Sequence, residues 1–354
     1  MDLNDFKAFK VIDQEDMLSH IDGLPDQLER AWKLGNTWPL PGWKGIERVV
    51  ITGMGGSAIG ADLLVAYTEA ACSVPVLVHR DYTLPGWAKG PETLVIASSH
   101  SGNTEETLSA FADATQKGCR RLAIATGGEL AKAAPAASAE LWTFDHKGQP
   151  RTAVGFSFGL LLAAFTRLSL IPDPSQELAG AIIAMKAQQP QLKAEVPVTK
   201  NPAKRQAGQL MDRWVAVLGS GILSPVARRW KGQISELAKA WAQFEFLPES
   251  DHNTLAGSQN PSELLARTTV LFLRSASDHP RNKLRLEFTR QTLMLEGMGT
   301  DTYDAKGDTP LANLWTTLHF GDYMAYYLAL LYEVDPTPVA ALQKLKKDLG
   351  AVPL

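Results

Sequence analysis

Two short segments of the sequence place glycines and hydroxyl side chains directly after an apolar run. GMGGSA, residues 53–58, follows VVIT, and SSHSGNTEET, residues 98–107, follows TLVIA. In an open parallel sheet, ligands bind beyond the carboxyl ends of the strands, so Ser57 would face Ser99, Ser101 and Thr104. Hydroxyls and free backbone amides at a helix start can hold a phosphate dianion through charge-assisted hydrogen bonds of about 1.5–3 kcal/mol each. We therefore expect a phosphate site.

Each segment also has other interpretations. The first satisfies the dinucleotide-binding pattern GxGxxG/A, but that pattern requires an acidic residue about 20 positions further on. This chain has His79 and Arg80 there, which disfavours dinucleotide binding. A purely structural turn remains open for the first segment, and a helix cap completed by Glu105 or Glu106 remains open for the second.

Strand-like and helix-like runs alternate around these segments. The strand-like runs are VVITG, VPVLVHR, TLVIASS, RRLAIATGG and ELWTFD, and stretches with helical periodicity separate them. Such alternation predicts an α/β fold with a parallel sheet covered by helices on both faces. We therefore expect one doubly wound domain in this part of the chain.

The second half of the sequence resembles the first. The run RWVAVLGSGILSPVARRW aligns with RVVITGMGGSAIGADLL so that Gly219 lies under Gly53 and Gly221 under Gly55, with the same offset in both pairs. This alignment indicates an internal duplication and a second doubly wound domain with a mainly parallel sheet. The predicted organisation is an N-terminal helical segment, a first domain, connecting helices, a second domain and a C-terminal helical tail, over residues 1–44, 45–150, 151–204, 205–333 and 334–354.

Several segments resemble sugar isomerase (SIS) domains, and specifically the bifunctional phosphoglucose/phosphomannose isomerases, which contain two of them. The segments are GMGGSAIG, SSHSGNTEET, ATGGELA, QPRTAVG, SELAKAW, LPESDHNTLAG and DPTPVAALQKLKKDL, and they cover most of the chain. The resemblance implies two SIS-type, flavodoxin-like αβα domains and an aldose–ketose isomerase that acts on hexose 6-phosphates without a cofactor. It also implies that the sugar phosphate is bound by Gly55, Gly56, Ser57, Ser99, Ser101 and Thr104.

The resemblance implies roles for four further residues. Glu236 would act as the base that moves a proton between adjacent carbons. Arg151 would stabilise the enediolate formed on the way. His252 would open the sugar ring from a neighbouring subunit, which implies a homodimer. Lys346 would point into the site, with Lys344 and Lys347 as adjacent alternatives.

This sequence departs from the family pattern at three positions. His100 stands where the family often has an aromatic residue, and Ser235 and Leu237 flank Glu236 where asparagines are common. These departures concern substrate preference more than the class of reaction.

Taken without the resemblance, the same four residues have simpler explanations. Glu236 could be a helix-surface acid paired with Lys239 three residues later, beside an apolar face made of Ile234, Leu237, Ala238 and Trp241. Arg151 could be a solvated loop charge, and His252 could cap an acidic turn. A basic run that ends a helix complements the helix dipole and needs no ligand.

Composition excludes several classes of protein. The 35 Lys and Arg residues against 38 Asp and Glu residues give a net charge of −3, so no basic excess favours nucleic acid or an anionic membrane. Cys72 and Cys119 are too few for a disulfide framework, which favours a reducing, cytoplasmic location. The amino terminus lacks an apolar signal core, and the longest uncharged apolar run, residues 152–166, is shorter than a membrane span of about 18 residues.

Three further expectations concern metals and competing functions. The seven histidines include no HExxH motif and no pair at i,i+4, so we expect no catalytic metal. An amino-sugar synthase-type SIS isomerase is an alternative, but the chain shows no glutaminase region with a leading cysteine. A non-catalytic sugar-phosphate-binding SIS regulator is a second alternative, although residues 1–33 are too few and not basic enough for a helix-turn-helix domain.

Overall fold

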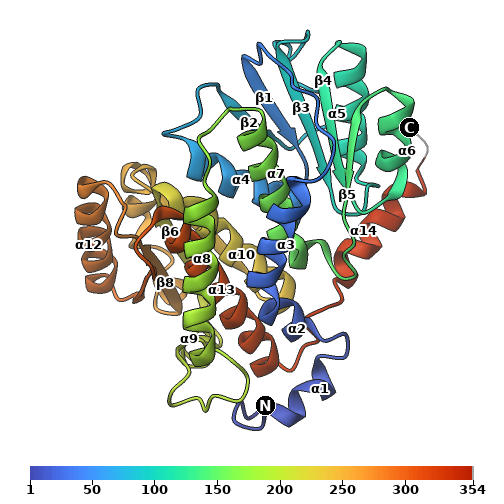
Figure 1. Cartoon of the computed structure of the whole chain (residues 1–354). Helices are drawn as coiled ribbons and strands as arrows, with labels where there is room; N and C mark the ends of the chain where they lie inside the picture. The colour runs from blue at the N-terminus through green and yellow to red at the C-terminus, as the bar shows by residue number, and fades with distance from the viewer. Residues whose placement is uncertain (353–354) are drawn as a thin grey trace.

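The computed structural model describes residues 1–352 and contains two parallel sheets with a layer of helices between them (Figure 1). The strand order is β2-β1-β3-β4-β5 in the first sheet and β7-β6-β8-β9 in the second. All pairings are parallel. The strands are β1 (Arg48–Thr52), β2 (Val76–His79), β3 (Thr93–Ser99), β4 (Arg120–Ala125), β5 (Glu140–Thr143), β6 (Trp214–Ser220), β7 (Ala242–Leu247), β8 (Thr268–Arg274) and β9 (Gly299–Asp304).

Helices precede, cover and connect the sheets. The α-helices are α1 (Phe9–Ile12), α2 (Met17–Asp22), α3 (Leu24–Gly35), α4 (Gly55–Thr68), α5 (Glu105–Gln116), α6 (Gly128–Ala136), α7 (Val154–Arg167), α8 (Ser175–Gln188), α9 (Pro202–Gln209), α10 (Ser224–Leu237), α11 (Ser262–Leu265), α12 (Pro280–Leu295), α13 (Pro310–Leu331) and α14 (Ala340–Gly350). The 3₁₀ helices are η1 (Phe6–Ala8), η2 (Pro150–Ala153), η3 (Gln189–Gln191), η4 (Gly221–Leu223), η5 (Glu249–His252) and η6 (Thr254–Gly257).

The strand order confirms the predicted fold class. The order 2-1-3-4-5 of the first sheet is that of doubly wound, flavodoxin-like folds. The second sheet repeats this order and ends one strand earlier. β3 lies at the centre of the first sheet and is buried at every residue, because helices cover both faces there. All five strands expected in the first half are present.

Aromatic packing joins the two halves of the chain. Phe158 on α7 and Trp315 on α13 are fully buried, and their ring centroids are 5.2 Å apart in an edge-to-face arrangement. The largest apolar cluster accordingly takes residues from β1, α7, α10 and α13. The domain limits at residues 150 and 204 remain a prediction, because this one core extends across both of them.

The apolar helices belong to this core. α7 is buried along nearly its whole length, as is α13. Within residues 1–352, no helix has both the length and the apolar character needed to cross a membrane.

Candidate active site

A cleft of about 310 Å³ lies between the first sheet's helices and α10. The start of α4 borders it with Gly55 and Gly56, η2 borders it with Arg151, and the last turns of α10 border it with Glu236. The other lining residues are Ile59, Arg80, Arg228, Arg229, Lys231, Gly232, Gln233 and Phe244. The structure thus brings the predicted base and the predicted enediolate-stabilising arginine beside the first glycine loop.

The glycines of this loop allow α4 to pack directly on η2. A Cβ atom at position 56 would lie 2.5 Å from the carbonyl oxygen of Pro150, so a larger residue would push the loop away from Arg151. Gly55 has φ +49°, in the left-handed region that favours glycine. Close approach and backbone conformation therefore explain the glycine pattern without a dinucleotide.

The two hydroxyl-bearing loops meet at the carboxyl ends of β1 and β3. The backbone N–H of His100 donates to Ser57 Oγ at 3.0 Å, and Ser99 Oγ donates to Thr104 Oγ1 at 3.0 Å. Ser101 Oγ accepts from the backbone N–H of the residue two positions later. Within residues 1–352, the hydroxyl hydrogens of Ser57, Ser101 and Thr104 have no acceptor, so all three can be donated to a bound anion.

The helix-cap interpretation of the second loop is not observed. Thr104 is the N-cap residue of α5, but its side chain makes no capping hydrogen bond. Its Oγ1 accepts from Ser99 instead. The loop hydroxyls therefore bond to one another and to backbone amides of the loop, and Thr104 does not cap α5.

Arg151 is held rigidly beside Glu236. Its Nη1 lies 3.4 Å from Glu236 Oε2, and its Nη2 donates to the carbonyl oxygens of Pro336 at 2.8 Å and Thr337 at 2.5 Å. The arginine side chain is 3% exposed, whereas that of Glu236 is 31% exposed and open to the cleft. Burial lowers the pKa of Arg151 from its usual value, although the neighbouring carboxylate of Glu236 opposes this.

A buried ion pair fixes α10, which carries Glu236. Arg229 binds both carboxylate oxygens of Asp322 on α13, at 3.1 and 2.8 Å, and Gln233 donates to the same carboxylate at 2.9 Å. Arg229 also donates to the backbone carbonyl of Arg151 at 2.8 Å. These bonds attach α10 to both α13 and η2, so the position of Glu236 relative to Arg151 follows from the core.

The alternative explanation of Glu236, a surface pair with Lys239, is not observed within residues 1–352. Lys239 Nζ donates to the backbone carbonyl of Glu236 at 2.7 Å, and the Glu236 carboxylate pairs with Arg151 instead. Lys239 takes φ +54° just after α10 ends at Leu237, and Trp241 is 74% exposed instead of completing an apolar face. Desolvation and the charge of Arg151 lower the pKa of Lys239 to about 8. Lys239 therefore lies next to Glu236 and Arg151 at the site, whereas its spacing alone favoured an ion pair with the Glu236 carboxylate.

Two of the predicted catalytic residues lie outside the cleft of a single chain. His252 ends η5 and is exposed, and Lys346 is exposed on α14. Neither contributes to the cleft lining. Of the alternative lysines, Lys344 pairs with Asp348 one turn later on the same helix, at 2.5 Å.

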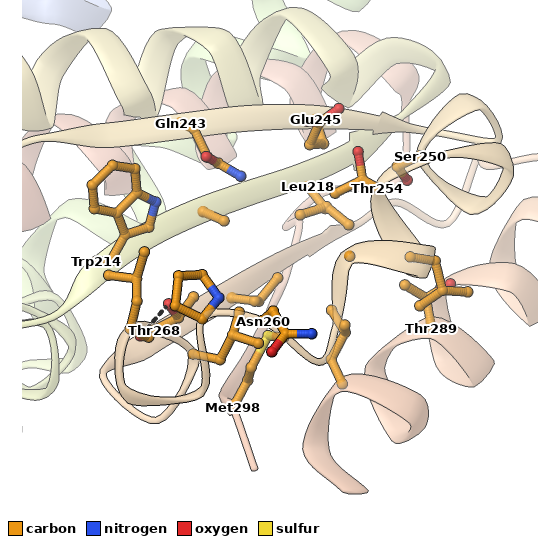
Figure 2. A pocket seen from close by; sticks show the side chains of 18 residues that line it. Trp214, Leu218, Gln243, Glu245, Ser250, Thr254, Asn260, Thr268, Thr289 and Met298 are labelled. Atoms are coloured by element: carbon orange, nitrogen blue, oxygen red, sulfur yellow. Dashed lines mark hydrogen bonds between the residues drawn. The ribbon is translucent and has the colours of Figure 1, made fainter. Parts of the chain in front are cut away.

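A second cavity, of about 190 Å³, lies against the second sheet (Figure 2). Trp214 lies at one end and Ser250 at the other, and most of the remaining lining is apolar. None of the ten predicted site residues lines this cavity, which is on the face of the sheet and contains no arginine or lysine. It therefore does not suit a sugar phosphate.

The side chains of residues 1–352 include no group of three or more histidine, cysteine, aspartate or glutamate residues placed to hold a metal ion. The cleft has instead a dense set of arginine and lysine side chains around Glu236. Arg80 and Arg228 pair with Asp62, and Arg229 pairs with Asp322, so protein carboxylates already balance part of this positive charge.

Comparison with known proteins identifies relatives along nearly the whole chain. Residues 199–349 match the model of the bacterial phospho-glucose isomerase C-terminal SIS domain. The bifunctional phosphoglucose/phosphomannose isomerase of Caldicellulosiruptor bescii is 38% identical over 338 residues, which cover 95% of this chain and 99% of that protein. The protein of the same name from Aquifex aeolicus is 33% identical over 88% of this chain and 92% of its own length.

Solved structures share the fold. The C-terminal domain of glucosamine-fructose-6-phosphate aminotransferase from Francisella tularensis has a TM-score of 0.71 at 13% identity, over 91% of this chain and 98% of that one. A glucose-6-phosphate isomerase like protein from Thermus thermophilus has a TM-score of 0.64 at 20% identity, over 97% and 99%. Identity over the full length of the sequence relatives goes further than this shared fold: the chain is an enzyme of the bifunctional phosphoglucose/phosphomannose isomerase family.

Proposed function

We propose that this enzyme interconverts glucose 6-phosphate and mannose 6-phosphate with fructose 6-phosphate through a cis-enediol intermediate. The observation that carries the proposal is the cleft in which Glu236 and Arg151 lie beside Gly55 and Gly56. The names of the sequence relatives supply the substrate class. The physical argument for each step follows from the residues around that cleft.

Binding uses the two hydroxyl-bearing loops. The phosphate accepts hydrogen bonds from the hydroxyls of Ser57, Ser101 and Thr104, whose hydrogens have no acceptor within residues 1–352. Gly55 and Gly56 provide backbone amides at the start of α4, where the helix dipole favours an anion. Ser99 supports this cradle through its bond to Thr104. The sugar then extends from the phosphate into the cleft toward Glu236.

Proton transfer is the role of Glu236. Starting from the open-chain aldose, its carboxylate removes the proton from C2, the electrons of that C–H bond form a double bond between C1 and C2, and the carbonyl electrons move to the oxygen on C1. The resulting enediolate carries negative charge, which Arg151 stabilises because its guanidinium is fixed by the carbonyls of Pro336 and Thr337. A proton passes from the oxygen on C2 to the oxygen on C1, and Glu236 then returns its proton to C1, which gives the ketose. Return to the other face of C2, after rotation about the neighbouring carbon–carbon bond, gives the epimeric aldose.

A second subunit completes the site in this proposal. Ring opening needs an acid–base group near the ring oxygen, and His252 and Lys346 are the candidates. Both are exposed and outside the cleft of their own chain. A homodimer in which His252 enters the neighbouring cleft accounts for both facts. Lys346 would approach the substrate from α14.

Turnover by the purified protein tests the proposal. Fructose 6-phosphate is supplied with a metal chelator and no ammonia source, and glucose 6-phosphate is followed by a coupled dehydrogenase; mannose 6-phosphate is tested separately as substrate. Isomerisation of both aldoses is expected. Binding of these sugar phosphates without turnover would instead identify a non-catalytic regulator, and turnover only with an ammonia donor would identify an amino-sugar synthase-type enzyme.

A further inference from the structure

Three histidines from distant parts of the chain meet beside the phosphate loops, and one of them belongs to the second loop. His20 lies on α2, His100 lies in the loop after β3, and His146 follows β5. His100 Nε2 and His146 Nδ1 are 2.9 Å apart, and the ring centroids of His20 and His146 are 5.4 Å apart. The cleft described above does not include any of the three. They require an explanation of their own.

The hydrogen-bond partners determine which nitrogen carries each proton. Thr152 Oγ1 has one hydrogen, which it donates to the carbonyl of Gln149 at 2.8 Å. It therefore accepts in its 3.4 Å contact with His146 Nε2, so His146 carries its proton on Nε2. His146 Nδ1 is then an acceptor, and His100 must donate to it from Nε2. The result is a directed chain from His100 through His146 to Thr152.

The surroundings keep His146 neutral, as this chain of bonds requires. Phe144 and Phe156 pack against the histidine pair. The charged and titratable groups that face His146 are His20, His100, Arg30 and Asp145, and only the last of these favours a positive charge on the ring. Burial, followed by the charges of the histidines and Arg30, lowers the pKa of His146 to about 4. His146 is therefore neutral at pH 7, in agreement with a single proton on Nε2.

The chain of bonds connects the two parts of the site that must keep a fixed distance. At one end, the backbone N–H of His100 donates to Ser57 Oγ, and its carbonyl accepts from Thr126 Oγ1 at 2.7 Å. At the other end, Thr152 adjoins Arg151 in η2. We propose that His100 and His146 are positioning residues that hold the phosphate loop against η2 and thereby set the affinity for the phosphate group. The proposal rests on the phosphate site of the proposed function.

The loop is the part that would move if this link were broken. Arg151 is fixed independently by the carbonyls of Pro336 and Thr337 and by the bond from Arg229 to its own carbonyl. Loss of the histidine link should therefore weaken phosphate binding more than it slows the chemical step. This difference separates a positioning role from a general loss of structure.

Two substitutions of His100 distinguish the hydrogen bond from the packing. His100→Phe retains a ring against Phe144 but cannot donate to His146, and we expect KM for fructose 6-phosphate to rise about three- to tenfold with kcat changed less than about twofold. His100→Gln places an amide N–H near the position of Nε2 and should restore KM to within about twofold of the wild type. An unchanged KM in His100→Phe, or equal impairment of both variants, would overturn the proposal.

Nuclear magnetic resonance tests the same link without turnover. In the wild type, ¹⁵N spectra at pH 7 should show His100 and His146 both protonated on Nε2 and not on Nδ1. The Kd for inorganic phosphate, from amide shift titration, should rise about three- to tenfold in His100→Phe and recover in His100→Gln. An Nδ1 proton on His146, or an unchanged Kd in His100→Phe, would refute the link even if the protein isomerises sugars. The protonated nitrogen of His146 and the Kd for inorganic phosphate test the histidine link even if the wild type does not isomerise sugars.

Discussion

Gly55 and Gly221 have the same left-handed backbone conformation, with φ +49° at each, in loops that follow the first strand of each sheet. The residues before them match as well: Met54 has φ −128° and ψ 157°, and Ser220 has φ −130° and ψ 158°. This agreement supports the duplication expected from the sequence. The two halves share the geometry of this loop. They differ in the side chains that lie next to the loop at the carboxyl end of the strand.

In the second half, a protein carboxylate lies next to this loop. Asp278 is 6% exposed, and it accepts hydrogen bonds from Ser220 Oγ at 2.8 Å and from the backbone N–H of Ser275 at 2.9 Å. A fixed negative charge at this place repels a phosphate. The corresponding place in the first half has the hydroxyls of Ser57, Ser99 and Thr104 and the backbone amide of His100.

We therefore predict one phosphate site per chain. Titration with inorganic phosphate should saturate at one equivalent, and Ser57→Ala should weaken binding by about tenfold or more, because a charge-assisted hydrogen bond is lost. Asp278→Asn is the matched control in the other half and should leave this affinity unchanged. Two equivalents, or weaker binding in Asp278→Asn alone, would contradict the assignment.

Arg151→Lys should lower kcat by about 100-fold, with a smaller effect on KM. Lysine retains the charge, but it lacks the planar fork that faces Glu236 and the two carbonyls at once. Arg167→Lys is a suitable control, because Arg167 also donates to two backbone carbonyls, those of Gly35 and Trp38, but does not line the cleft. Its kcat should stay within about twofold of the wild type, and equal losses in both variants would remove the special role of Arg151.

Mixed dimers test the shared site. Glu236→Gln and His252→Asn chains should each be inactive alone, since each removes one group from every site. After mixing, unfolding and refolding together at equal concentrations, half of the dimers are mixed and each contains one intact site, so about one quarter of wild-type activity should return. No recovery, despite mixed dimers seen by mass spectrometry, would place His252 in its own chain's site or outside any site.

Acid stability should depend on a histidine in the core. His319 on α13 is fully buried, its Nε2 lies 2.8 Å from the Ile21 carbonyl, and burial lowers its pKa to about 4. Between this pKa and the unfolded value of about 6.5, the unfolded chain binds more protons, so the free energy of unfolding falls as the pH falls.

His319→Gln preserves a donor to Ile21 and removes the titration. Urea unfolding at pH 7 and pH 4 should show a loss of stability that is smaller in the variant by up to about 3 kcal/mol. An equal loss of unfolding free energy in the wild type and the variant would mean that protonation of His319 does not cause the loss of stability at low pH.

The sequence predicted local features well and long-range contacts poorly. The five strands of the first sheet and the glycine turns follow from periodicity and from backbone conformation, which are local properties. The bonds from Arg151 to the carbonyls of Pro336 and Thr337, and the pairing of His100 with His146, join segments that no periodicity relates. Lys239 was misassigned because its spacing fits a helix, whereas α10 ends before it.

Catalysis by Glu236 is the central claim, and one variant tests it most directly. Glu236→Gln keeps the size and polarity of the side chain but cannot take up the C1 proton of fructose 6-phosphate, so turnover of this ketose in the coupled assay should fall by at least about 10⁴-fold. The Kd for inorganic phosphate should remain within about twofold of the wild type, because within residues 1–352 no hydrogen bond joins Glu236 to Ser57, Ser101 or Thr104. Turnover near the wild-type rate in Glu236→Gln would contradict the proposed mechanism.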